Sequence, residues 1–482
     1  MTTSLDRANY RVTFGVLVLG VSAYALLQSL VIPALTTIQS TLHASQNTVT
    51  WVVTAYLLSA SIFTPVMGRV GDILGKEHVM VATLVALSVG SVIAAEAHSV
   101  SVLIIGRAVQ GIGGGVIPLA FGIIRDEFPR EKLASAIGTI AAMTAVGGGV
   151  GLIVAGPILT HLGLHWLFWI PFVMTTAAAI LAYFLVPESP ERSPGRISYS
   201  AVVLLSAWLV ALLLAVSEAP TWGWFATKTL VLDGLGLVLL VGWVLVELRV
   251  SDPVVDMKMM RVPAVWTNNL VAFLFGIGMY SVFAFLPEFV QTPRSSGYGF
   301  SASTTASGLF LIPLSLGMFF VGLYSGKIAD RFGSKAAVVA GSAVSGIGYV
   351  VLALAHAHAW QIYVASSLLG LGLGLAFSAM SNLIVRAVPS HQTGVASGMN
   401  ANIRTIGGAV GAGVMSSIVT SHVTISGLPA QSGYTDGFLF LAGCTALAVV
   451  AALLIPTSSP DHAAHLNHAE LAMVPGGTLT EG

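Results

Sequence analysis

Long apolar runs alternate with short polar breaks along nearly the whole chain. Fourteen of these runs hold about 20 mostly apolar residues, the length that an α-helix needs to cross the hydrocarbon core of a membrane. They lie at 12–33, 49–68, 79–97, 102–124, 133–160, 166–186, 197–217, 229–246, 264–287, 301–325, 336–355, 359–385, 394–420 and 437–456. The pattern predicts an all-α polytopic membrane protein with 14 transmembrane helices.

Basic residues gather in every second polar break. If the N-terminus lies in the cytoplasm, sixteen of the 20 Lys and Arg residues fall on the cytoplasmic side, and only Lys228 and Arg294 fall on the other side. The remaining two, Arg107 and Arg404, lie inside predicted helices. Because cytoplasmic loops of membrane proteins carry an excess of Lys and Arg, this distribution supports the helix count and predicts that both the N- and C-termini are cytoplasmic.

The composition excludes several classes of function. The chain is 55% hydrophobic and 8% charged, whereas a soluble domain averages about 25% charged residues. Its formal net charge is zero, so nothing indicates a nucleic-acid partner. Its single cysteine, Cys444, permits neither an internal disulfide nor a cysteine metal cluster. The sequence has no Walker loop, His/Glu metal pair or nucleophile elbow. We therefore expect no metal, no cofactor and no enzymatic activity, and this chain alone is not an ATP-driven pump.

One short polar pattern occurs twice. The segment 68–76, GRVGDILGK, recurs 258 residues later as the segment 326–335, GKIADRFGSK. The segments 110–115 and 146–151 likewise match the glycine-rich segments 370–374 and 406–411. Repetition at half-chain distance in a membrane protein indicates two related halves, an arrangement typical of transporters.

Two polar breaks, 187–195 and 251–263, divide the chain further. We predict an N-terminal six-helix bundle over 1–186, a linker with two extra helices over 187–262, and a pseudo-symmetric C-terminal six-helix bundle over 263–456. The segment 457–482 is rich in Ser, His, Gly and Pro and is predicted to be a disordered cytoplasmic tail.

The two copies of the repeated pattern are predicted to be tight cytoplasmic loops. Glycine permits a sharp reversal of the chain, and an aspartate there can accept hydrogen bonds from a helix N-terminus and pair with a nearby basic residue. We predict a cytoplasmic gate or latch built from both copies; the alternative is a turn that only fixes topology through its charge. The predicted latch residues are Gly68, Asp72, Gly75, Lys76, Gly326, Asp330, Arg331 and Gly333.

These two segments resemble the signature loop of the major facilitator superfamily. The segments 51–58, WVVTAYLL, and 286–293, LPEFVQTP, together with the two-helix insert, are similar to its fourteen-helix drug:proton antiporter branch, particularly in actinobacteria. The resemblance covers essentially the whole chain. It implies a secondary transporter of the bacterial plasma membrane whose two bundles rock about a central cavity. The second copy is the fuller match, with Arg331 where the first has Ile73, which predicts a weaker latch in the first copy.

Arg107 and Glu288 are the candidates for proton coupling. A charge at the centre of a membrane helix costs about 3 kcal/mol on insertion scales, so Arg107 must meet a wet cavity or polar partners. The resemblance implies that Arg107 couples protons; permanent bonding to backbone carbonyls is the alternative. Related antiporters place an aspartate in the first helix, where this chain has Tyr24. Glu288 is then a candidate proton carrier, unless it lies solvated in the outer interface.

The predicted helix 133–160 is rich in glycine. Gly147 and Gly151 are four residues apart, which allows close helix packing, and Pro157 follows Gly156. The resemblance places an antiporter motif in this helix, but Leu152 occupies the position of the motif's proline. We predict a flexible, closely packed helix; tight packing alone would also explain these glycines.

Aromatic and amide side chains in the membrane helices are candidates for the substrate cavity. Aromatic walls suit large, apolar and often cationic molecules, and amides are costly to bury in lipid. The candidate cavity residues are Tyr24, Gln28, Tyr56, Gln110, Asn268, Tyr280, Asn382, Asn402 and Arg404.

The sequence thus favours proton-coupled efflux of hydrophobic or cationic drugs, antibiotics or secondary metabolites by alternating access. The expected partners are a small-molecule substrate, protons and the lipid bilayer, and the expected oligomeric state is a monomer. One alternative is an importer, or a lipid or metabolite transporter with different coupling. Another is a non-transporting membrane sensor, for which the chain offers no soluble output domain.

Overall fold

The computed structural model describes residues 10–44, 46–188, 197–389, 392–421 and 429–456. It is all-α and contains 14 helices long and apolar enough to cross a membrane, at the predicted positions. Helices prevail because a membrane offers no water to satisfy backbone polar groups, and an α-helix satisfies them within its own segment. The predicted disordered tail, 457–482, lies outside the described residues.

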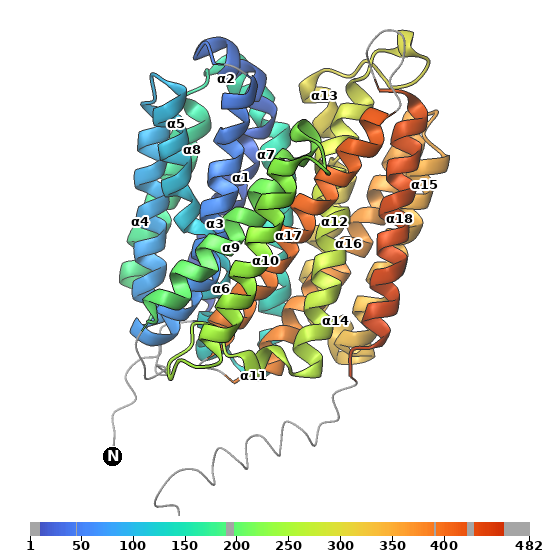
Figure 1. The fold of residues 1–482 in the computed structure, drawn as a ribbon. Helices are drawn as coiled ribbons and strands as arrows, with labels where there is room; N and C mark the ends of the chain where they lie inside the picture. The colour runs from blue at the N-terminus through green and yellow to red at the C-terminus, as the bar shows by residue number, and fades with distance from the viewer. Residues whose placement is uncertain (1–9, 45, 189–196, 390–391, 422–428, 457–482) are drawn as a thin grey trace, which may run out of the picture.

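Two bundles stand side by side in Figure 1. The spans of the first bundle are α1 (Tyr10–Leu30), α3 (Gln46–Leu74), α4 (Lys76–Ala95), α5 (Val100–Gly111) with α6 (Val116–Glu127), α7 (Arg130–His161) and α8 (Trp166–Leu185). The spans of the second are α12 (Pro263–Gln291), α13 (Thr304–Leu309) with α14 (Ile312–Phe332), α15 (Ser334–Leu354), α16 (Ala359–Ala387), α17 (Thr393–Ser421) and α18 (Gln431–Leu453).

α1 begins and α18 ends at the same end of the molecule, the lower end in Figure 1. We call this the inner end, and the charge distribution predicts that it faces the cytoplasm. The opposite, outer end carries the short helix α2 (Leu35–Thr41), which the sequence analysis did not predict.

Two predicted spans are interrupted. The run 102–124 passes from α5 to α6 through a 3-10 turn, η2 (Ile112–Gly115), where three consecutive glycines weaken α-helical preference. The run 301–325 breaks between α13 and α14, and a proline lies in the first turn of α14, where the missing N–H costs nothing.

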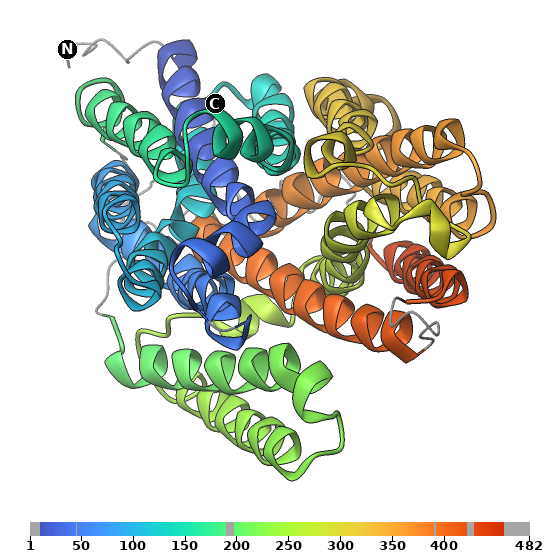
Figure 2. The same ribbon diagram turned by 90° about the horizontal axis from the view of Figure 1, so that it is seen from above.

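The two-helix insert packs against one side of the pair of bundles, as Figure 2 shows. It consists of α9 (Tyr199–Trp222) and α10 (Thr227–Glu247) and is followed by the short α11 (Met257–Met260). α9 contacts α3 of the first bundle and α17 of the second. Near the outer end, the Trp224 indole donates a 2.6 Å hydrogen bond to the hydroxyl of Ser417 in α17.

The Glu247 side chain stabilises the C-terminal end of α10, at the inner end of the insert. It accepts hydrogen bonds from Trp243 and from the backbone amides of Val254 and Val255, at 3.0, 2.9 and 3.3 Å. These bonds fold the segment after α10 back against the helix, and so hold the connection to α11 and α12.

Glycines set the distance between α12 and α17 in the second bundle. A Cβ added at Gly276 would lie 2.0 Å from the carbonyl oxygen of Arg404, and one added at Gly407 would lie 2.1 Å from that of Phe273. In membranes helix association depends on close packing of this kind, because lipid tails are as apolar as leucine.

Gly276→Ala is therefore expected to destabilise the second bundle, by about 1–3 kcal/mol of overpacking, and to lower the melting temperature of the protein in detergent. Gly242→Ala is the matched control, because nothing lies within 4 Å of a Cβ at that position in α10. It should leave the melting temperature unchanged or raise it. Equal effects of the two substitutions would contradict this account of the packing.

Candidate functional site

The first repeated segment is helical almost to its end. α3 runs through Leu74, α4 begins at Lys76, and Gly75 alone makes the reversal with φ of +109°. Gly333 makes the equivalent reversal with φ of +80°. The predicted loops are thus much shorter than expected, since at each copy a single glycine separates the two helices. Glycine is the residue that adopts this φ without strain.

The glycine that opens each copy faces the opposite bundle. A Cβ added at Gly68 would lie 2.6 Å from the carbonyl oxygen of Gly394 in α17, and one added at Gly326 would lie 2.8 Å from the amide nitrogen of Ser135 in α7. The two copies therefore form equivalent contacts, each bringing its helix against the inner end of a helix from the other half.

Asp72 connects the bundles electrostatically. Its side chain is 1% exposed, and its Oδ2 accepts a 3.4 Å hydrogen bond from the amide of Val395, in the first turn of α17. The partial positive charge of a helix N-terminus favours a carboxylate there. Lys76 lies 4.0 Å from Asp72 and 2.6 Å from Asp126 in α6, so one buried ammonium neutralises part of the charge of two carboxylates.

We call the contact between the two bundles at the inner end the seam. A second polar contact crosses it, beside the bond from Val395 to Asp72. Arg125 in α6 donates hydrogen bonds to the carbonyl oxygen of Val385 in α16, at 2.5 Å, and to the hydroxyl of Thr393 in α17, at 2.6 Å. Arg125 is one of the sixteen basic residues predicted to lie on the cytoplasmic side, where no further role was expected of it. The sequence shows that Arg125 directly precedes Asp126, but spacing along the chain does not show that both lie beside the predicted latch in the fold.

The second copy lacks an equivalent buried charge network. Asp330 and Arg331 are exposed at the inner end of α14. The structure thus differs from the expectation that the first copy holds the weaker contact, since it is Asp72 of the first copy that reaches the other bundle.

Asn382, a predicted cavity residue, forms a hydrogen bond between the two bundles. Its amide donates a 3.1 Å hydrogen bond to the carbonyl oxygen of Ala134 in α7, and the nearby Ser378 hydroxyl donates to that of Gly138 at 3.3 Å. Asn268, also proposed for the cavity, donates instead to Met380 within the second bundle, at 3.0 Å. Both amides stabilise helix contacts in this conformation.

Arg107 is fully buried among the first bundle's helices. Its Nε donates to the carbonyl oxygen of Val52 at 3.1 Å, and its Nη1 donates to Leu27 at 3.5 Å and to the side chain of Gln110 at 2.8 Å. The Tyr56 ring lies 4.1 Å from the guanidinium carbon. Its Nη2 has no hydrogen-bond partner among the described residues. Carbonyl bonding, the structural alternative, is thus present, but it leaves part of the cation unsatisfied.

Arg404 is buried in α17 of the second bundle. It is 6% exposed, its guanidinium carbon lies 4.3 Å from the Phe377 ring, and its Nε has no hydrogen-bond partner within the described part of the chain. Its guanidinium hydrogen-bonds with the Tyr280 side chain, and Tyr24 lies within electrostatic range.

Tyr24 lies within electrostatic range of both Arg107 and Arg404. Its ring centroid lies 6.5 Å from that of Tyr56. Gln28 and Tyr280 are half-buried. This group of residues, which we call the central cluster, joins α1, α3, α5, α12 and α17 and consists of Tyr24, Tyr56, Arg107, Tyr280 and Arg404.

Asn402 is buried as well. Neither polar atom of its amide has a hydrogen-bond partner among the residues described. An unsatisfied buried amide costs about 1–3 kcal/mol, so Asn402 remains a candidate for contact with a ligand.

Glu288 lies away from the central cluster, one turn from the outer end of α12. Its side chain is exposed, and it accepts a 2.9 Å hydrogen bond from the hydroxyl of Tyr434 in α18. Both the solvated position and a role in proton uptake fit this geometry.

The glycines of α7 are sites of close packing. A Cβ at Gly147 or Gly151 would collide with Ala25 or Ser29 of α1, and one at Gly156 would lie 2.5 Å from the hydroxyl of Thr305 in α13. Pro157 lies within α7, which continues to His161. α7 therefore packs on α1 of its own bundle and on α13 and α14 of the other.

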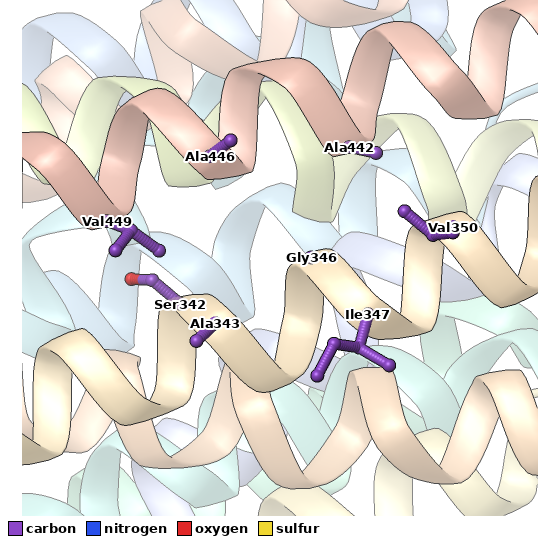
Figure 3. Close-up of a pocket in the computed structure, with 8 residues that line it drawn as sticks. All are labelled: Ser342, Ala343, Gly346, Ile347, Val350, Ala442, Ala446 and Val449. Atoms are coloured by element: carbon purple, nitrogen blue, oxygen red, sulfur yellow. The ribbon is translucent and has the colours of Figure 1, made fainter.

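One apolar groove lies elsewhere, between α15 and α18, with a volume of about 320 Å³ (Figure 3). Its lining is almost entirely aliphatic, with Ser342 as the one hydroxyl that Figure 3 labels. It is separate from the central cluster and offers no charged group to a ligand.

Two bundles in contact at their inner ends, with buried charges at their centre, define a polytopic protein of the transporter type. The family model described as Major Facilitator Superfamily matches residues 17–412 and 270–475. The chain belongs to this superfamily.

Relatives agree with this assignment. The tetracenomycin C resistance and export protein of Streptomyces glaucescens is 28% identical over 84% of this chain and 75% of its own. The uridine/deoxyuridine transporter of Lactococcus lactis is 26% identical over 92% of this chain and 94% of its own. Other relatives are named multidrug transporter or multidrug resistance proteins.

A solved structure shares the fold. That of the human organic anion transporter MFSD10 aligns with a TM-score of 0.63 and 15% identity, over 92% of this chain and 99% of the other. At this identity the likeness concerns the fold alone.

Lys76→Met is expected to destabilise the inner end strongly, because it leaves the Asp72 and Asp126 carboxylates buried together without their ammonium. Removing one partner of a buried ion pair costs about 3–5 kcal/mol, which should lower the melting temperature in detergent. Lys335→Met, the equivalent change in the second copy, should have little effect, since Lys335 is only half-buried. A similar loss in both variants would count against the charge network.

Proposed function

We propose that this transporter exports apolar organic molecules, such as drugs, antibiotics or secondary metabolites, from a bacterial cell in exchange for protons. The main support for this proposal is the set of contacts between the bundles at the inner end. Asp72, Arg125 and Asn382 all bind groups of the opposite half. A seam held by such bonds is a gate, since hydrogen bonds of about 1 kcal/mol each can form and break as the bundles rock.

The names of relatives support export in particular, because they include an antibiotic export protein and multidrug resistance proteins. In the proposed cycle the inner seam is closed while the outer side releases substrate and takes up protons. Glu288 is the proposed proton carrier, because it lies near the outer end of α12 and its bond from Tyr434 is strongest while it is ionised. Arg107 is the proposed coupling residue within the membrane.

A second candidate is nucleoside transport. The uridine/deoxyuridine transporter aligns over almost the full length of both chains, and the buried amide of Asn402 without partners in the described chain suits the donor and acceptor edge of a base. Uptake of labelled uridine by cells that contain the protein, absent from cells that lack it, would favour this candidate over export.

Inverted membrane vesicles test export directly. When respiration acidifies the vesicle interior, substrates of the transporter should enter the vesicles and release part of the pH gradient, as reported by dequenching of an acridine dye. A panel of apolar antibiotics and dyes of either charge serves as the substrate set. Substrate entry that persists unchanged after nigericin collapses the gradient would rule out proton coupling.

Asp72→Asn should slow transport in the same vesicles by about fivefold or more, because it removes a charge-assisted bond that closes the inner seam. Asp330→Asn is the matched control at the exposed position of the second copy and should transport at the native rate. The rates are compared at equal protein content by immunoblot. Native transport by Asp72→Asn, or equal slowing in both variants, would remove the latch from the mechanism.

A further inference from the structure

The centre of the protein carries two buried cations. Arg107 and Arg404 come from different bundles, and both lie within electrostatic range of the same buried residue, Tyr24. A guanidinium stays protonated under all physiological conditions. Both side chains are almost completely inaccessible, so water does not screen their charge.

No carboxylate balances these charges in the described part of the chain, where neither arginine forms an ion pair. The acidic residues of the two bundles' membrane helices lie toward the helix ends, such as Asp72 and Asp126 at the inner end and Glu288 at the outer end. Removing an ion from water costs several kcal/mol unless an opposite charge and hydrogen bonds replace the water. Two backbone carbonyls and Gln110 at Arg107, the Tyr280 hydroxyl at Arg404, and an aromatic face at each replace only part of that water, because Nη2 of Arg107 and Nε of Arg404 have no partner in the described chain.

We propose that the missing counter-ion is the substrate: the central cluster binds an organic anion, with an oxyanion group such as a carboxylate between Arg107 and Arg404 and an aromatic or apolar body against the neighbouring rings. Guanidinium donors match the geometry of a carboxylate, and Tyr56 and Phe377 already stack on the two cations. The inference rests on the proposed transport function and specifies its substrate class.

The same charges disfavour a cationic substrate. A cation in the central cluster would meet two like charges in a medium where Coulomb energies are many times larger than in water. From the sequence, aromatic walls were expected to favour cationic drugs. That expectation rested on the rings alone and left out Arg107 and Arg404, which lie over two of them. The aromatic faces are occupied by the protein's own guanidinium groups, and so are less available to a ligand cation.

Three probes with one body test the proposal: naphthylacetate, which is anionic, naphthylacetamide, which is neutral, and naphthylethylammonium, which is cationic. Binding of each labelled probe to the purified full-length protein is measured in detergent. Naphthylacetate should bind at least about tenfold tighter than the amide, and Arg404→Gln should remove most of that difference while leaving amide binding unchanged. Arg294→Gln, which removes an exposed cation outside the bundles, should leave all three affinities unchanged.

The outcomes separate the substrate class from the function. Tighter binding of the ammonium than of the carboxylate, or no binding of any probe, would overturn the anion site. So would an Arg404→Gln variant that loses carboxylate and amide binding equally, since that pattern indicates a structural role. A protein that does not export would be recognised in a separate transport measurement. Proteoliposomes with a pH gradient would then accumulate none of the three probes and no ethidium. Naphthylacetate would still bind in detergent, and Arg404→Gln would still weaken that binding.

Discussion

The close approach of backbones at the inner end governs the rest of the structure. Where Gly68 meets Gly394 and Gly326 meets Ser135, no side chain separates the helices. That proximity lets the Asp72 carboxylate reach the first turn of α17 and Arg125 reach Val385 and Thr393. A bulkier residue at these points would push the bundles apart and leave those charges buried without partners, a cost of several kcal/mol. Packing and electrostatics at the seam therefore depend on each other.

The two halves are alike in backbone and unlike in charge. Both repeated segments supply a glycine that packs on the opposite bundle, but only the first supplies a buried aspartate, with Lys76 and Asp126 beside it. The centre shows the reverse: each half contributes one arginine, and each arginine faces an aromatic ring. A centre to which each half contributes one cation, and a seam with a single charge network, suit a transporter in which both halves hold the substrate while one set of contacts closes the inner end. α9 of the insert also contacts α3 and α17, the helices that carry Gly68 and Gly394, from the lateral face of the two bundles.

The sequence predicted the architecture because apolar run length and loop charge are one-dimensional signals. All 14 spans lie where expected. It predicted less of the site, because spacing along one helix does not show what lies across a seam. Asn382 looked like a cavity amide, yet Ala134 of the other bundle accepts its hydrogen bond. Arg125 looked like a topology charge and proved to bridge the bundles. The extent of the repeated loops was also misjudged, since polar residues at a helix end resemble a loop when read from composition alone.

Distances between spin labels test the central claim that the inner seam is a gate held by Asp72. One pair of labels replaces the exposed His78 and Arg386 near the inner end, and a second replaces the exposed His98 and His358 near the outer end, both in a Cys444→Ala protein in lipid nanodiscs. The account predicts that adding Asp72→Asn lengthens the inner distance and shortens the outer one, since the bundles rock about the centre. Unchanged distances, or both changing in the same direction, would contradict it.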